Sequence, residues 1–204
     1  MRRRPTTLRR AAPQHEVLAD DLATLDAEHP LDATDAVVYT NAYGKPGLPG
    51  VKDLHFNVSH AGDWVVCAVS HQELGVDVER LRDIDLRLAE RFFHASEVRR
   101  LAQAGGTRRR DLFFELWTAK EAFLKADGRG LQRALDSFWV EDDGQGGQHI
   151  VADDAPRWCV ERPRLDNEHK LALCTRPGSS LQGLKCLSLA ELSAAPEPEA
   201  CLWR

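Results

Sequence analysis

The stretch that decides the fold is LHFNVSHAGDWVVCAVSHQELGVDVE, which runs from Leu54 to Glu79. Apolar and polar residues alternate over 54–60, as they do in a half-buried strand. An Ala-Gly-Asp turn follows, and the apolar run 64–69 is typical of a central strand. A third strand is expected at 74–79, where apolar residues again fall on every second position. This part of the chain therefore predicts three consecutive strands.

Helical patterns lie on both sides of these strands. Apolar residues recur at helical spacing over 14–25, 86–93, 97–104 and 111–126. The last pattern is the strongest, because its apolar residues form one stripe and Gly128 is a suitable C-cap. Gly105 and Gly106 are expected to end the helix before it.

The rest of the chain is expected to be rich in strands and loops. Strands are predicted at 36–40, 138–141, 158–161, 170–174 and 184–189. Glycine and proline mark 41–50 as a loop, and the tail from residue 193 is expected to be loose. The segments DWVVCAV and HKLALCT each place a cysteine in an apolar strand, which suits two related α+β halves.

The composition is that of an ordinary soluble protein. The 204 residues are 43% hydrophobic and 29% charged, which suits one compact unit or two small halves sharing a core. The formal net charge of -5 does not suggest a nucleic-acid partner. No apolar stretch reaches transmembrane length, so no membrane association is expected. The five cysteines lack CxxC spacing, which favours reduced thiols in a cytoplasmic protein.

The first ten residues are strongly basic. Arginine occupies positions 2, 3, 4, 9 and 10. The cluster is either an anion site or a solvated, frayed terminus, and its position alone slightly favours the terminus.

Two carboxylates stand close together in LGVDVE. Asp77 and Glu79 fall on one face of the expected strand, opposite its apolar residues. Adjacent carboxylates repel each other, so they need a cation between them, a shared proton or a solvent-facing position. An oxygen-binding cation such as Mg²⁺ meets the first need, and an exposed strand edge meets the last.

Three more features carry polar groups suited to phosphate chemistry. Glu121 and Lys125 are four residues apart on one helical face, where a plain surface ion pair is the simpler explanation. Ser59-His60 ends a strand before a turn, and such a histidine binds a phosphate or serves only the structure. The segment Gly44-Lys45-Pro46 places a cation on a rigid loop.

The ordered set of segments is more specific than any one of them. YGKP, FNVSH, GVDVE, RFFHASE and WTAKEAFLKADGRGL follow one another between residues 43 and 131. Together they closely resemble the surfactin-type 4′-phosphopantetheinyl transferases. The resemblance implies an α+β fold of two similar halves related by a pseudo-twofold axis, with the active site in the cleft between them. We expect an N-terminal half at 1–72, shortened at its start so that the opening strand is missing, and a C-terminal half at 73–204.

The resemblance also implies the site. Mg²⁺ would be held by the matching carboxylates Asp77, Glu79 and Glu121. Contacts to coenzyme A would come from Gly44, Lys45, Pro46, Asn57, Ser59, His60 and Lys125. Glu121, Lys125 and His60 would be catalytic, with Glu121 helping to remove the serine proton and Lys125 stabilising the departing phosphate.

The implied reaction moves the phosphopantetheine group of coenzyme A to a serine of an apo acyl or peptidyl carrier protein and releases adenosine 3′,5′-bisphosphate. The expected partners are coenzyme A and the carrier, and a monomer is sufficient. The alternatives are another Mg²⁺-dependent phosphotransferase or hydrolase, or an inactive relative that only binds coenzyme A.

Overall fold

The computed structural model describes residues 6–11, 39–48, 54–144, 146–179 and 181–188. The helix expected at 14–25, the tail from residue 193 and all but two residues of the strand expected at 36–40 lie outside these ranges. Within them, no helix is both long enough and apolar enough to cross a membrane.

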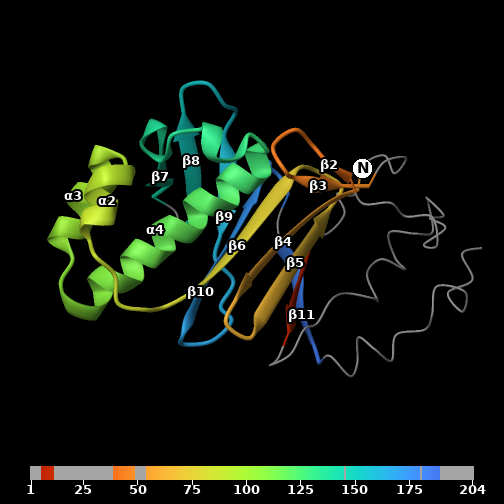
Figure 1. Ribbon diagram of the computed structural model, residues 1–204, viewed down its shortest axis with the longest axis horizontal. Coiled ribbons are helices and arrows are strands. Elements are labelled where there is room, and N and C mark those ends of the chain that lie inside the picture. The colour runs from red at the N-terminus through yellow and green to blue at the C-terminus, as the bar shows by residue number, and fades with distance from the viewer. Residues whose placement is uncertain (1–5, 12–38, 49–53, 145, 180, 189–204) are drawn as a thin grey trace, which may run out of the picture.

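The first sheet has four strands in the order β11-β1-β5-β4 (Figure 1). Its members are β1 (Thr6–Ala11), β4 (His55–Ala61), β5 (Trp64–Ser70) and β11 (Leu181–Leu187). β4 and β5 form an antiparallel hairpin, β1 is antiparallel to β5, and β11 is parallel to β1. The short strands β2 (Tyr39–Thr40) and β3 (Pro46–Gly47) form a separate ribbon.

The second sheet is antiparallel, with five strands in the order β6-β10-β9-β8-β7. They are β6 (Leu74–Arg80), β7 (Phe138–Asp142), β8 (Gln148–Ala152), β9 (Trp158–Glu161) and β10 (His169–Thr175). The helices are α2 (Arg87–Phe92), α3 (Ala95–Gln103) and α4 (Gly106–Asp127), followed by 3₁₀ turns at Gly130–Gln132 and Leu135–Ser137.

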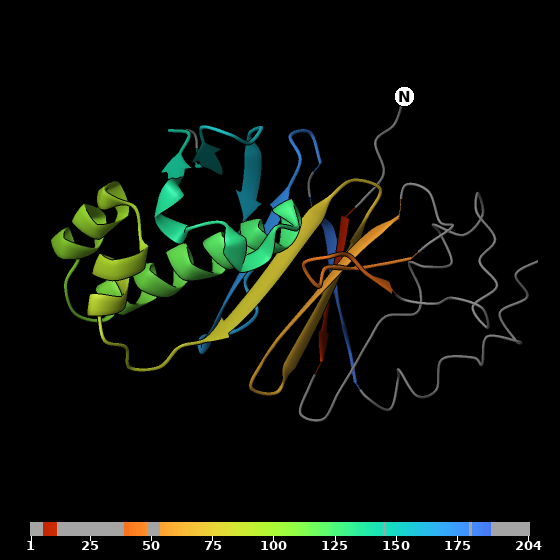
Figure 2. The ribbon, with the colours of Figure 1, turned by 45° about the horizontal axis from the view of Figure 1, so that its top comes forward.

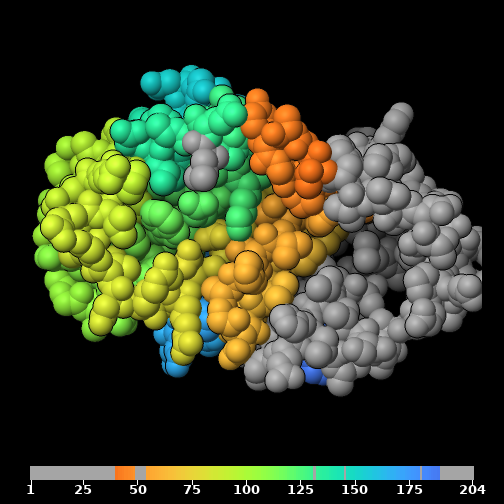
Figure 3. Space-filling view, viewed as in Figure 1, coloured from red at the N-terminus to blue at the C-terminus, as the bar shows by residue number. Residues whose placement is uncertain are grey.

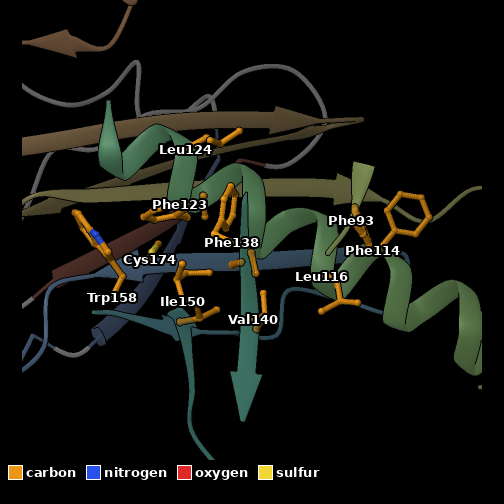
Figure 4. Packing of buried hydrophobic residues seen from close by; sticks show 14 of the residues in the cluster. Phe93, Phe114, Leu116, Phe123, Leu124, Phe138, Val140, Ile150, Trp158 and Cys174 are labelled. Carbon is orange, nitrogen blue, oxygen red and sulfur yellow. The ribbon is translucent and has the colours of Figure 1, made fainter. Parts of the chain in front are cut away.

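Helix α4 lies directly on the second sheet, across β6 and β10 (Figure 2). Phe123 packs against Phe138 and Trp158 beneath the helix (Figure 4). A Cβ atom on Gly75 would lie 2.1 Å from the carbonyl oxygen of Ala122, so only glycine permits the helix to approach β6 this closely.

A second core lies between the two sheets. Leu74, Val76 and Val78 of β6 pack there with Val66 and Ala68 of β5. Because strand residues alternate, Gly75, Asp77 and Glu79 face the opposite side, toward α4. The predicted placement of the two carboxylates on the face opposite the apolar residues is therefore confirmed.

The two sheets meet where β4 and β6 run side by side. Their backbones are joined by side chains: Oδ1 of Asn57 accepts from the N–H of Val76 at 2.9 Å, and Oγ of Ser59 accepts from the N–H of Val78 at 3.2 Å. Both bonds join residues 19 positions apart, so the strands run in the same direction. We call this boundary the β4/β6 seam.

The predicted α+β class is confirmed, whereas several details differ. Thr6–Ala11 forms β1 and pairs with two neighbours, a strand that the sequence did not predict, and the expected shortening of the N-terminal half stays a prediction. Arg9 and Arg10 thus belong to a paired strand and not to a frayed terminus. Helix α4 begins at Gly106, five residues before the predicted start, since its polar first turn carries no apolar stripe.

The division of the chain at residues 72 and 73 stays a prediction. Most strands follow it, but β11 returns from the C-terminal part to join the first sheet. Strand β8 was not predicted, because QHIVA has too few apolar residues to stand out; it pairs on both sides with β7 and β9.

Candidate active site

Asp77 is the most buried of the proposed metal ligands, with 5% of its surface exposed. Its Oδ1 accepts from Oγ of Ser59 at 2.9 Å and from Nζ of Lys125 at 2.8 Å. Its Oδ2 is buried and has no hydrogen-bond partner within the described part of the chain. Burial raises the pKa of the carboxyl group, and the charge of Lys125 opposes that rise. The carboxylate therefore has one oxygen still available to a cation.

Glu79 lies at the end of β6 and is held by two donors. Nε1 of Trp117 donates to Oε1 at 3.2 Å, and a guanidinium nitrogen of Arg82 donates to Oε2 at 2.8 Å. The indole is itself fixed, because it stacks with Phe93 and Phe113. Trp117 thereby links the aromatic core to the candidate site, a role that its place one turn before Glu121 only hinted at.

Glu121 projects from α4 toward the same region. The pKa of Glu121 is raised from 4.5 to about 6. Burial is the largest cause, followed by the negative charge of Asp77; the charge of Glu79 also raises the pKa, and that of Lys125 opposes the rise. The three carboxyl groups are thus close enough to influence one another, which is unfavourable without a compensating cation.

The chemistry of the three groups fits Mg²⁺, which prefers carboxylate oxygens and a small number of protein ligands. The unpartnered Oδ2 of Asp77 and the raised pKa of Glu121 both indicate a need for positive charge. However, no three His, Cys, Asp or Glu side chains of the described residues are already arranged as a metal-binding group. Asp77 is engaged with Lys125, and Glu79 with Arg82 and Trp117, so metal binding requires these side chains to exchange partners.

Lys125 is the cation paired with Asp77. Besides Asp77, its Nζ donates to Oγ of Ser59 at 2.9 Å and to the carbonyl of Val76 at 3.1 Å. Lys125 therefore contacts both β4 and β6 at the seam. The helical spacing alone favoured a plain surface ion pair between Lys125 and Glu121, whereas the partner of Lys125 is Asp77.

A pocket of about 240 Å³ lies beside this group. Its lining comes from three segments: Tyr43, Gly44, Lys45 and Pro46 from the loop, Asn57 and Val58 from β4, and Glu121, Leu124, Lys125, Gly128 and Gly130 from α4 and the turn after it. The loop stands against the last turns of α4 on the face shown in Figure 3. Six of the predicted site residues thus surround one cavity.

Lys45 is turned toward the end of α4. Its Nζ donates to the carbonyl of Ala126 at 2.8 Å and to that of Leu74 at 3.3 Å. A lysine in this position satisfies the last carbonyls of a helix. Burial lowers the pKa of the amine. Its predicted contact with phosphate stays a prediction.

The two polar residues of β4 that face the seam have structural partners. Asn57 and Ser59 bind the backbone of β6, and Ser59 also binds Asp77. His60 is exposed on the other face of β4, and it is not among the described residues that line the pocket. Its predicted role in binding and catalysis remains untested.

A buried ion pair supports the helix next to Glu121. Lys120 and Glu97 are fully buried, with Nζ and Oε2 2.8 Å apart. Lys120 also donates to the carbonyls of Leu135 and Phe138, while Glu97 accepts from the N–H of Val140. The sequence shows these residues in RFFHASE and WTAKEAF, but their pairing across 23 positions has no local signature.

The chain is similar to several known proteins. Residues 73–174 match the family model described as the 4′-phosphopantetheinyl transferase superfamily. Over 182 residues the chain is 34% identical to the 4′-phosphopantetheinyl transferase Sfp of Bacillus subtilis (strain 168), covering 87% of this chain and 81% of that protein. Over 135 residues it is 45% identical to the 4′-phosphopantetheinyl transferase gsp of Aneurinibacillus migulanus, covering 66% and 56%.

Among solved structures, a holo-(acyl-carrier-protein) synthase from Bacillus anthracis str. Ames in complex with CoA (3′,5′-ADP) is 22% identical, with a TM-score of 0.43, covering 50% of this chain and 92% of that one. The family model covers half of the chain, and the Bacillus subtilis relative matches 87% of it. The chain therefore belongs to the 4′-phosphopantetheinyl transferase superfamily.

Proposed function

We propose that this protein transfers the 4′-phosphopantetheine group of coenzyme A to a serine of an apo carrier protein. The observation that carries the proposal is the convergence of Asp77, Glu121 and Lys125 beside one pocket, in a chain of this family. The serine oxygen bonds to the phosphorus that bears pantetheine. The bond to the second phosphate breaks, and adenosine 3′,5′-bisphosphate leaves.

The acidic and the basic residues have different proposed roles. Asp77, Glu79 and Glu121 would hold Mg²⁺, which neutralises the pyrophosphate when it is bound. Lys125 lines the pocket and carries the positive charge suited to the departing phosphate.

Glu121 is the proposed acceptor of the serine proton. Its carboxylate lines the pocket beside Lys125, where it can accept a proton from a bound hydroxyl group. Lys45 and His60 are proposed to contact the phosphates of coenzyme A. The residues that line the pocket come from one chain, so we propose that a monomer is sufficient. We also propose that the reaction takes place in the cytoplasm.

The direct test is the intact mass of several apo carrier proteins after incubation with coenzyme A and Mg²⁺. We expect the gain of one phosphopantetheine group on at least one carrier. The Asp77→Ala variant should lose this activity, whereas Asp85→Ala, which removes an exposed partner of Arg87, should keep it. Cleavage of coenzyme A with unmodified carriers would indicate a hydrolase, and binding without turnover would indicate an inactive relative.

A further inference from the structure

Asn41 is a polar residue outside the predicted site whose side chain joins two walls of the pocket. Its Oδ1 accepts from the backbone N–H groups of Tyr43 and Lys45, both at 2.9 Å. Its Nδ2 donates to the carbonyl of Gly128 at 3.2 Å, across 87 positions of sequence. One side chain thus closes the loop on itself and attaches it to the end of α4.

The backbone of the same loop supports this arrangement. The N–H of Asn41 donates to the carbonyl of Lys45 at 2.9 Å, and the N–H of Gly44 donates to the carbonyl of Asn41 at 3.0 Å. Gly44 has a φ of 87°, a conformation that glycine adopts readily. The turn is therefore preformed, and the amide of Asn41 completes its hydrogen bonding.

The attachment point on α4 is equally specific. Gly128 ends the helix with a φ of 75°, and a Cβ atom there would lie 3.3 Å from the side chain of Lys45 and 3.5 Å from Nδ2 of Asn41. Loop and helix end are thus in contact at this glycine. Lys125, which lines the same pocket, lies only three residues before it.

We propose that Asn41 is a positioning residue, which holds the Tyr43–Pro46 wall at a fixed distance from the α4 wall and so sets the affinity for coenzyme A. This inference rests on the proposed function, because it takes the pocket as the coenzyme A site. Asn41 does not itself touch the reacting atoms. It acts through the loop, and its removal leaves the carboxylates and Lys125 in place.

Steady-state kinetics with a carrier that the wild type modifies test this role. Asn41→Ala should raise KM for coenzyme A about tenfold, the effect of losing one or two hydrogen bonds. It should leave kcat and KM for the carrier within about threefold, because the catalytic groups are unmoved. Asn41→Asp keeps the two acceptor bonds to the loop but sets a carboxylate against the Gly128 carbonyl. It should resemble Asn41→Ala, because the attachment to α4 is lost in both variants; wild-type constants in Asn41→Asp would overturn that attachment as the cause.

The matched control is Asn167→Ala, which removes an exposed asparagine bonded to Arg164 away from the pocket. It should have wild-type constants. A KM for coenzyme A within twofold of wild type in Asn41→Ala, or an equal loss in kcat, would overturn the positioning role. A wild-type protein that neither binds coenzyme A in calorimetry nor modifies a carrier would overturn the proposed function as well, so the two failures are distinguishable.

Discussion

Replacing Glu121 by glutamine should stabilise the metal-free protein at neutral pH. The folded state holds this carboxyl at a pKa of about 6, against 4.5 ordinarily, because of its burial and the charge of Asp77. Between these pH values the folded state binds more protons than the unfolded state, so stability falls as pH rises through the window. The shift corresponds to about 2 kcal/mol at most, and partial solvent exposure reduces this to about 1 kcal/mol.

The assay is chemical denaturation in buffer containing a chelator. At pH 7.5, Glu121→Gln should be more stable than wild type by about 1 kcal/mol, and at pH 4 the difference should disappear. Adding Mg²⁺ should then reverse the order, because a ligand stabilises the state that binds it and the variant lacks one proposed ligand.

Glu115→Gln on the same helix is the matched control. That carboxylate accepts from Arg108 at 2.8 Å and from Lys170 at 3.3 Å, so its loss should lower stability at neutral pH. If Glu121→Gln is instead less stable than wild type without metal at pH 7.5, the carboxyl is favourably solvated and the account of the site as short of positive charge fails.

Three further substitutions test other parts of the structure. Gly75→Ala should cost about 3 kcal/mol in denaturation, because its Cβ would overlap the backbone of α4, whereas Gly183→Ala, with open space, should be nearly neutral; equal effects would contradict the close helix packing. Lys120→Met should cost about 4 kcal/mol because it leaves Glu97 buried without its cation, and the double variant with Glu97→Gln should recover part of that loss; no recovery would refute the pairing. Lys125→Met should weaken coenzyme A binding in calorimetry while strengthening Mg²⁺ binding without coenzyme A, since the carboxylate it occupies is freed; weaker binding of both would argue against that competition.

Local sequence patterns predicted those elements whose burial is itself periodic. The strand at 64–69 and the helix at 111–126 appear as β5 and α4 because their apolar residues face a core. By contrast, β1 reads TTLRRA, and only its pairing with β5 and β11 makes it a strand. Such pairing depends on residues far away in the chain, which no short pattern reveals.

In the candidate site too, local features could be predicted from the sequence and contacts between distant residues could not. Strand alternation was enough to place Asp77 and Glu79 on one face, because that is a property of the strand alone. The partners of Lys45 could not be predicted, since the carbonyl of Ala126 lies 81 positions away. Sequence therefore identified candidate residues, and the structure shows which of them also hold the fold together.

The β4/β6 seam explains why the candidate site lies where it does. If β4 and β6 paired through their backbones, Val76 and Val78 would give their N–H groups to β4 and leave no room between the strands. Instead, Asn57 and Ser59 accept these hydrogen bonds with their side chains. Lys125 donates to the carbonyl of Val76 and to Asp77 at this same boundary. Asn57 also lines the pocket, and Ser59 binds Asp77 and Lys125, so a substitution at either residue should affect stability and ligand binding together.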